Sequence, residues 1–264
     1  MYGGLVALSA SPISEGQNDC VTCHRSFNAN TVHAWQESAH AAKGVGCADC
    51  HGTDHSEIFV RKGQVSAGVC GKCHEKEKAQ FDKSLHARAV DFMKADPKFE
   101  RLPAAVAELS CMGCHKIGAI ADDGSRGQCN SCHSSHRFSV NEARRPEACA
   151  TCHSGADHAH VEMWQASKHG QLYAEEETRG SAPTCVTCHM PNGTHDTSFG
   201  LSFGHVANGA VLAGTDPPVK MRSISLEAAR NKRSEMVQTC LPCHSSRFAA
   251  DSLAAADEVK KEAD

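Results

Sequence analysis

The five residues Cys47-Ala-Asp-Cys-His51 contain two cysteines separated by two residues and followed at once by a histidine. All 16 cysteines of the chain fall into eight such groups. The groups are Cys20, Cys23 and His24; Cys47, Cys50 and His51; Cys70, Cys73 and His74; Cys111, Cys114 and His115; Cys129, Cys132 and His133; Cys149, Cys152 and His153; Cys185, Cys188 and His189; and Cys240, Cys243 and His244. Zinc knuckles, disulfide frameworks and thioredoxin-like dithiols do not require the histidine. The pattern is the attachment sequence for c-type haem, in which both thiols bind the haem and the histidine is the proximal ligand of the iron.

The remaining composition suits a chain that binds several haems. Aromatic residues make up only 5% of the 264 residues, and the hydrophobic 40% includes all the cysteines. Because this leaves little for a conventional core, we expect porphyrin rings to fill the interior. The sequence predicts eight c-type haems with their iron. It also predicts a mainly α fold with extensive loops, in which short helices wrap around a closely packed eight-haem stack.

Charge, hydropathy and chemistry exclude some partners and compartments. The formal net charge is -4 without a basic block, so we expect no nucleic-acid partner. No apolar run approaches 18 residues, and we expect no transmembrane segment. Covalent haem attachment occurs outside the bacterial cytoplasm, so we expect a periplasmic or extracellular protein. We divide the chain into an N-terminal arm (1–19), an octahaem cytochrome c core (20–248) and a C-terminal helical tail (249–264).

A short unit recurs with one spacing, namely an aromatic residue, a serine three positions later and a histidine five positions later. The three copies are Trp35, Ser38 and His40; Phe81, Ser84 and His86; and Trp164, Ser167 and His169. The surrounding segments 31–43, 76–95 and 161–176 are typical of helices. We find no convincing strand pattern. The repeated unit indicates that its histidines share one role.

Ten of the 18 histidines lie outside the attachment sequences, and eight six-coordinate haems need eight distal ligands. The strongest distal candidates are the histidines of the repeated unit, His40, His86 and His169. The others are His55, His136, His195, His33, His158, His160 and His205. The supply therefore suffices for eight six-coordinate irons, with two histidines to spare.

Several motifs resemble the octahaem hydroxylamine oxidoreductase family. They are His33–Gly52, Asp123–Gly127, Ser135–Ser139, Pro146–Cys149, Gly155–His158, Ser167–Gly170 and Cys185–Pro191. The resemblance runs from Cys20 to Phe248. It implies a catalytic haem with an open iron at the fourth attachment sequence, and it implies that Asp157 and His158 line that pocket as catalytic residues. Family members that oxidise hydroxylamine also carry a tyrosine in a long helical domain after the last haem, where neither Tyr2 nor Tyr173 lies. We therefore do not expect the family's cross-linked haem or its trimer.

Two functions follow as hypotheses. The first is electron transfer through eight haems that are all capped by histidine, including the fourth. Its partners would be redox proteins or further copies of the chain, joined through exposed haem edges as a homo-oligomer or an extracellular conducting filament. The alternative is an oxidoreductase that acts on nitrite, hydroxylamine or similar small nitrogen species at the fourth haem. In that case Asp157 and His158 would relay protons.

Overall fold

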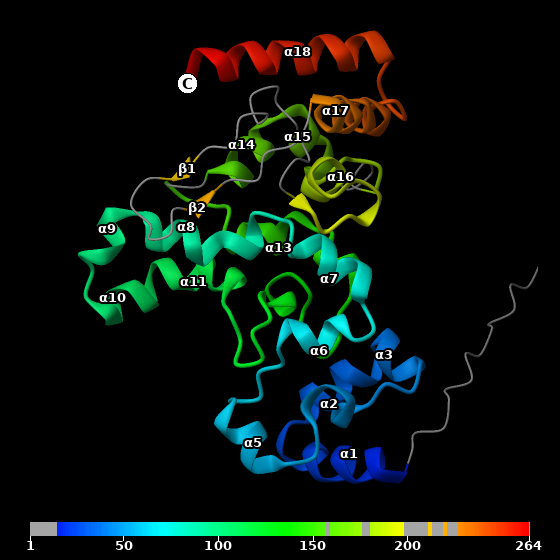
Figure 1. Cartoon of the computed structure of the whole chain (residues 1–264). Coiled ribbons are helices and arrows are strands. Elements are labelled where there is room, and N and C mark those ends of the chain that lie inside the picture. Colours follow the sequence, from blue (N-terminus) through cyan, green and yellow to red (C-terminus); the bar gives the residue numbers. More distant parts are fainter. Residues whose placement is uncertain are drawn as a thin grey trace, which may run out of the picture.

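The computed structural model describes residues 15–156, 159–175, 180–197, 211–212, 219–220 and 226–263. Within these ranges the regular secondary structure is almost wholly helical, and the short helices, joined by turns and loops, follow one another along a long axis (Figure 1). The only strands described are β1 (Val211–Leu212) and β2 (Val219–Lys220), which form an antiparallel pair. The predicted mainly α class is confirmed, and this small strand pair is an addition to it.

The described helices are mostly one or two turns long. The α-helices are α1 Glu15–Phe27, α2 Ala29–Gln36, α3 Ala39–Ala42, α4 Cys47–His51, α5 His55–Val60, α6 Ala67–Gly71, α7 Glu75–Phe81, α8 Ala89–Ala95, α9 Pro97–Glu100, α10 Ala104–Leu109, α11 Cys111–His115, α12 Val140–Ala143, α13 Pro146–Ala150, α14 His160–Ala166, α15 Lys168–Ala174, α16 Cys185–His189, α17 Leu226–Cys240 and α18 Ser246–Ala263. The 3-10 helices are η1 His86–Arg88, η2 Lys116–Gly118, η3 Cys129–Ser131 and η4 Pro191–Gly193. Helices α4, α11 and α16 each consist of one attachment sequence, so their two cysteines share a helix face.

The three segments predicted as continuous helices are interrupted. Segments 31–43 and 161–176 each break at the serine of the repeated unit. Ser38 and Ser167 have extended backbones, and each hydroxyl accepts a hydrogen bond from the backbone N–H three residues later. A serine in this position caps the start of a new helix, so the chain changes direction there. Segment 76–95 is likewise divided into α7, η1 and α8.

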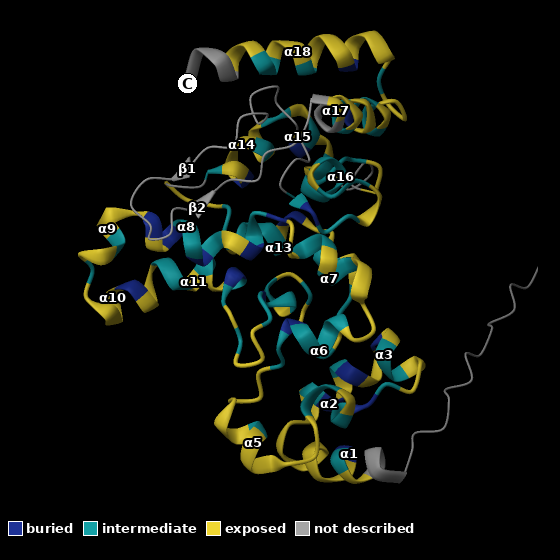
Figure 2. Cartoon of the chain, viewed as in Figure 1, coloured by how far each residue is buried: buried dark blue, intermediate teal, exposed yellow. Residues whose placement is uncertain are grey.

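Buried side chains are few and scattered over the elements (Figure 2). The one described cluster joins Val21 of α1 to Val32 and Trp35 of α2, and the Trp35 indole donates a hydrogen bond of 3.0 Å to the Val45 carbonyl. Meanwhile Phe59 is 84% exposed and Leu109 is 86% exposed. Because so small a side-chain core does not hold a chain of this length together, the fold suits a protein whose apolar surface covers large cofactors.

None of the described helices has the length and apolar character needed to cross a membrane. Helix α18 includes most of the segment predicted as a C-terminal tail, while residues 1–14 of the predicted N-terminal arm lie outside the described residues. The boundaries of these three parts stay a prediction.

Candidate haem-binding sites

Six of the eight attachment-site histidines lie opposite a second histidine in the described part of the chain. The pairs and their ring-centroid separations are His24 and His55, 6.3 Å; His51 and His136, 6.2 Å; His74 and His40, 6.0 Å; His133 and His195, 6.2 Å; His153 and His86, 5.9 Å; and His244 and His169, 6.1 Å. Two axial imidazoles on one iron have centroids about 6 Å apart, because each metal–nitrogen bond is about 2 Å and each nitrogen lies about 1 Å from its ring centre. The observed spacing therefore fits a six-coordinate haem iron.

The repeated unit explains how two of these histidines are held. Because Ser38 and Ser167 cap short helices, His40 and His169 fall in the first turn of α3 and α15. Behind His169, a Cβ at Gly170 would lie 2.2 Å from the Trp164 carbonyl oxygen, so only glycine permits this close approach of α15 to α14. The sequence predicted the unit, but it did not predict the serine caps or the role of this glycine.

The aromatic residues of the unit lie away from the paired histidine rings. Trp35 belongs to the cluster between α1 and α2, and Trp164 packs edge-on against Tyr173 with ring centroids 5.3 Å apart. Phe81 lies so close to Gly127 that a Cβ there would come within 2.4 Å of its ring. These contacts fix the helices from which the histidines project.

Burial favours the neutral form of five of the twelve paired rings, and of His189 as well. Burial is the main cause of a lowered pKa at six histidines. At all of them but His136, a nearby histidine lowers the pKa further. The rings concerned are His40, His51, His86, His133, His136 and His189. Neutral imidazole is the form that binds a metal, so these sites do not have to lose a proton at neutral pH before they ligate iron.

At the fourth site the structure describes how the attachment histidine is held, and at the seventh it describes a second histidine near the attachment histidine. Nδ1 of His115 lies 2.8 Å from the Ala89 carbonyl oxygen. Because a carbonyl only accepts, this contact puts the ring proton on Nδ1 and leaves Nε2 as a ligand. Near the seventh site, the ring of His160 lies 5.3 Å from that of His153 and close enough to His189 to lower the pKa of that ring, second to burial.

The remaining candidates fall into two groups. Asp157, His158 and His205 lie outside the described residues. His33 projects from α2 with 68% of its side chain exposed, and its Nδ1 lies 3.7 Å from a carboxylate oxygen of Glu37. In the described structure this ring is paired with a surface carboxylate, whereas the six distal candidates above face attachment histidines.

Cysteines of different attachment sequences lie near one another, because their thiols perturb each other's pKa. Three pairs of thiols lie close enough for one thiol to raise the pKa of the other, namely Cys129 acting on Cys70, Cys185 on Cys149, and Cys152 on Cys114. Four more pairs lie close enough that, second to burial, one thiolate raises the pKa of the other. They are Cys20 acting on Cys47, Cys70 on Cys50, Cys152 on Cys132, and Cys240 on Cys188. The attachment sites therefore adjoin in the order one, two, three, five, six, seven and eight, and the fourth lies beside the sixth.

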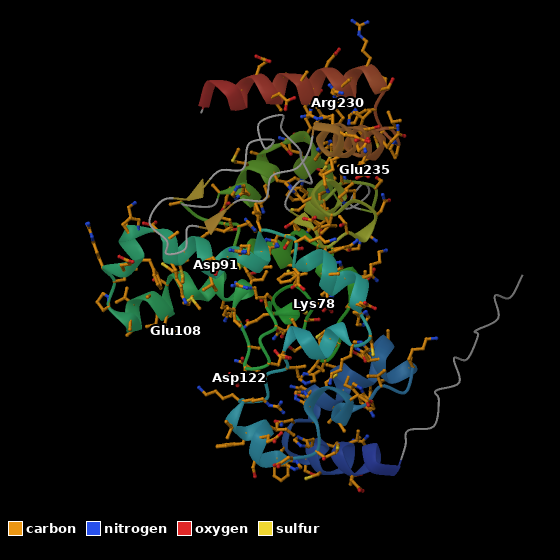
Figure 3. All side chains as sticks on the ribbon, in the orientation of Figure 1. Lys78, Asp91, Glu108, Asp122, Arg230 and Glu235 are labelled. Carbon is orange, nitrogen blue, oxygen red and sulfur yellow. The ribbon has the colours of Figure 1, made fainter. Side chains whose placement is uncertain are left out.

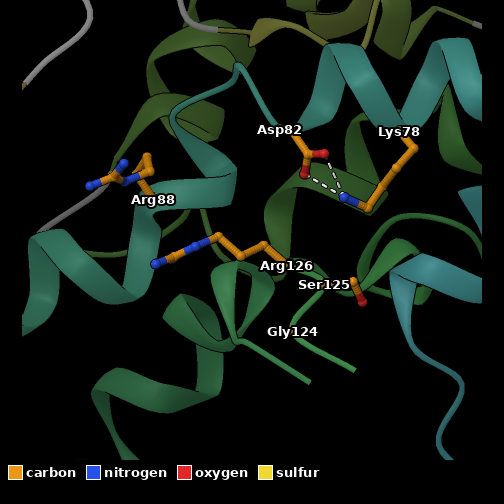
Figure 4. A pocket seen from close by; sticks show the side chains of 6 residues that line it. All are labelled: Lys78, Asp82, Arg88, Gly124, Ser125 and Arg126. Atoms are coloured by element: carbon orange, nitrogen blue, oxygen red, sulfur yellow. Dashed lines mark hydrogen bonds and ion pairs between the residues drawn. The ribbon is translucent and has the colours of Figure 1, made fainter. Parts of the chain in front are cut away.

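A charged pocket lies where α7 and η1 meet the segment that precedes Cys129 (Figure 4). Its lining residues are Lys78, Asp82, Arg88, Gly124, Ser125 and Arg126. Lys78 pairs with Asp82 at 2.5 Å, and both arginines pair with Asp91, at 2.6 and 3.2 Å. Lys78 and Asp91 lie near the middle of the molecule (Figure 3). Three cations against two carboxylates leave one positive charge, which can pair with a further carboxylate.

Short helices that carry repeated haem-attachment sequences, with a second histidine across most sites, define a multihaem cytochrome c. The family described as "Seven times multi-haem cytochrome CxxCH" matches residues 43–262, and the chain belongs to this family. The family described as "Cytochrome c554 and c-prime" matches residues 6–52.

Individual relatives point to proteins like hydroxylamine oxidoreductase. The chain is 27% identical over 313 residues to the "Probable nitrite reductase-hydroxylamine oxidoreductase fusion protein" of Kuenenia stuttgartiensis, with 91% of the chain and 35% of that protein covered. A solved "Hypothetical multiheme protein" matches with a TM-score of 0.76 and 20% identity over 98% of this chain and 82% of its own. The reducing HAO-like protein complex of Kuenenia stuttgartiensis matches with a TM-score of 0.65 and 25% identity over 92% of this chain and 58% of its own. The resemblance to this family is confirmed, and the chain spans about a third of the fusion protein.

Proposed function

We propose that the chain is an electron-transfer cytochrome with eight c-type haems, one at each pair of cysteines. The observation that carries the proposal is the near-constant separation, from 5.9 to 6.3 Å, between six attachment histidines and a second histidine. When bound, c-type haems supply irons that take up and release single electrons. Two imidazoles on each of the eight irons would leave no position for a substrate, and this favours transport over catalysis.

The protein's own residues would hold each haem through two cysteines, a proximal histidine and a distal histidine. The two cysteines of each pair would form the thioether bonds, and the histidine that follows would be the proximal ligand of the iron. We propose as distal ligands His55, His136, His40, His195, His86 and His169, for the first, second, third, fifth, sixth and eighth sites. We assign the fourth and seventh sites to histidines from the set of His158, His160 and His205. His33, which pairs with Glu37, is not part of this proposal.

The closeness of cysteines from different attachment sites supports a path for electrons along the molecule. Each close pair of cysteines joins two attachment sites, so thioether bonds formed there would bring two haem edges together. The first site lies on α1 and the eighth follows α17, at opposite ends of the molecule (Figure 1). Electrons would therefore enter at one end and leave at the other. We propose that redox proteins or further copies of this chain dock there, as an oligomer or a filament outside the cytoplasm.

Two measurements test this proposal. A pyridine haemochrome assay with an intact mass should give eight haems per matured chain, and six or fewer would contradict it. Low-temperature electron paramagnetic resonance (EPR) of the oxidised protein should show low-spin iron alone. The same sample should accept about one electron per haem in a reductive titration.

The relatives' names favour one alternative, an oxidoreductase of small nitrogen compounds at the fourth site. It predicts a high-spin iron that binds nitrite or cyanide promptly, and turnover that falls when Asp157 or His158 is replaced. A fully low-spin protein that ignores both ligands would exclude it. The histidines outside the attachment sequences outnumber the irons that they would cap, and this favours the carrier.

A further inference from the structure

One short turn contacts three haem sites. It follows His133 of the fifth site and includes His136, which faces His51 of the second site at 6.2 Å. Two residues later, Phe138 packs against His40, which faces His74 of the third site. Both His136 and Phe138 have positive φ, 71° and 47°. Such backbone is uncommon for residues other than glycine, and a bulky residue there is held by its surroundings.

An ion pair anchors the turn to the segment that carries His40. Arg137, between the two left-handed residues, donates hydrogen bonds of 2.7 and 3.1 Å to one carboxylate oxygen of Glu37 and one of 3.1 Å to Glu142. Glu37 is the C-cap residue of α2 and lies three residues before His40. The turn and the histidine are therefore fixed relative to each other.

The third site differs from its neighbours in the angle between its two rings. The planes of His40 and His74 are 78° apart, the largest angle among the six pairs, whereas those of the first, fifth and second sites are 8°, 17° and 21° apart. The sixth and eighth sites lie between these limits, at 53° and 58°. The Phe138 ring lies 5.2 Å from the His40 ring, also at 78°. Edge-to-face packing at this distance is a favoured arrangement of two rings. A rotation of the His40 ring toward the plane of His74 would break it.

We propose that Phe138 is a positioning residue that holds the His40 imidazole crossed with that of His74 at the third haem. This rests on the proposed function, because it takes His40 and His74 as ligands of one iron. Parallel imidazole planes split the iron dxz and dyz orbitals, which interact with the imidazole π systems, while crossed planes leave these two orbitals nearly equal in energy. Crossed ligands therefore give a ferric EPR signal with an unusually large highest g value, and parallel ligands give an ordinary rhombic signal.

The test uses the full-length, haem-loaded chain and EPR at liquid-helium temperature. In F138L we expect the large-g signal of one haem to be lost and a rhombic low-spin signal to gain the same intensity. We expect eight haems and no high-spin iron. F138Y keeps the ring and should keep the signal. The matched control is F59L, because Phe59 lies on α5 beside a site with parallel rings and is 84% exposed. F59L should leave the spectrum unchanged.

The third site itself is checked with H40A, which should lose the same large-g signal and gain a high-spin one. If H40A stays fully low-spin, the ligand assignment fails. If H40A behaves as expected but F138L keeps the large-g signal, the role of Phe138 is refuted while the proposed function stands. Should F138L bind fewer haems, F138M, whose flexible side chain fills similar space without a ring, is measured instead. An unchanged large-g signal in F138M would equally overturn the proposal.

Discussion

Replacing His169 by alanine should open one iron and leave the rest of the cytochrome intact. The His169 and His244 rings are 6.1 Å apart, so removal of one imidazole empties one axial position. The opposite ligand should stay in place, because His244 stacks on Phe248 with ring centroids 4.7 Å apart. Alanine is the best helix former, so α15 should still form and the haem should still be attached. With eight attachment sequences, we expect one eighth of the iron to become high-spin.

The assay is the high-spin EPR signal, integrated against the total haem of the same sample. Added imidazole should fill the open position and restore the low-spin spectrum, which separates a lost ligand from a damaged fold. His33→Ala is the matched control, because it also removes one imidazole but one whose described partner is the Glu37 carboxylate. A His169→Ala protein that carries eight haems and remains fully low-spin would refute the assignment.

Three further predictions concern stability and pH. Gly127→Ala should lower the free energy of unfolding by about 1–3 kcal/mol more than Gly124→Ala in denaturant titrations, because both glycines have positive φ but only the first would press a Cβ into the Phe81 ring. Trp35→Ala should cost about 3–5 kcal/mol and lower the Tm, since the ring is buried and its indole hydrogen-bonded; a change under about 1 kcal/mol would contradict this. Hydrogen bonds from two serines lower the pKa of Asp123 to about 2 from 3.8, so its contribution to stability should be complete above the unfolded pKa and be lost as the pH falls through about 2. Asp123→Asn should flatten that part of the stability–pH curve, and an unchanged curve would count against these hydrogen bonds.

The cofactor could be predicted from the sequence because its attachment is local. Two thiols and a histidine within five residues need only one helical turn to converge on a haem, as α4 and α11 show. The pairing of histidines could not be predicted in the same way. His40 faces His74 across an intervening attachment sequence, and His195 faces His133 from much further along the chain. Such pairs depend on how the loops fold back, and no spacing records that.

Backbone conformation was the second limit. The segment Ser135–Ser139 was predicted to carry a family motif and a candidate distal histidine, His136, but not the left-handed backbone that two of its residues adopt. Sequence rules reserve that conformation for glycine and asparagine, so a phenylalanine there gave no signal. The serines of the repeated unit are the opposite case. Their preference for helix starts was readable, but the apolar periodicity around Ser38 and Ser167 suggested one helix where the structure has two.

The closeness of thiols from different sites has a consequence for the assembly of the protein. Before the haems are attached, Cys70 and Cys129 would be within reach of each other, as would Cys149 and Cys185. Oxidation of either pair to a disulfide would remove one thiol from each of two attachment sequences. A single wrong disulfide would therefore prevent the complete attachment of two haems. Because the same closeness of the thiols brings neighbouring haems together, close spacing for electrons and vulnerability during biogenesis have one origin. Such a chain depends on a reductant that keeps its thiols free until the last haem is bound.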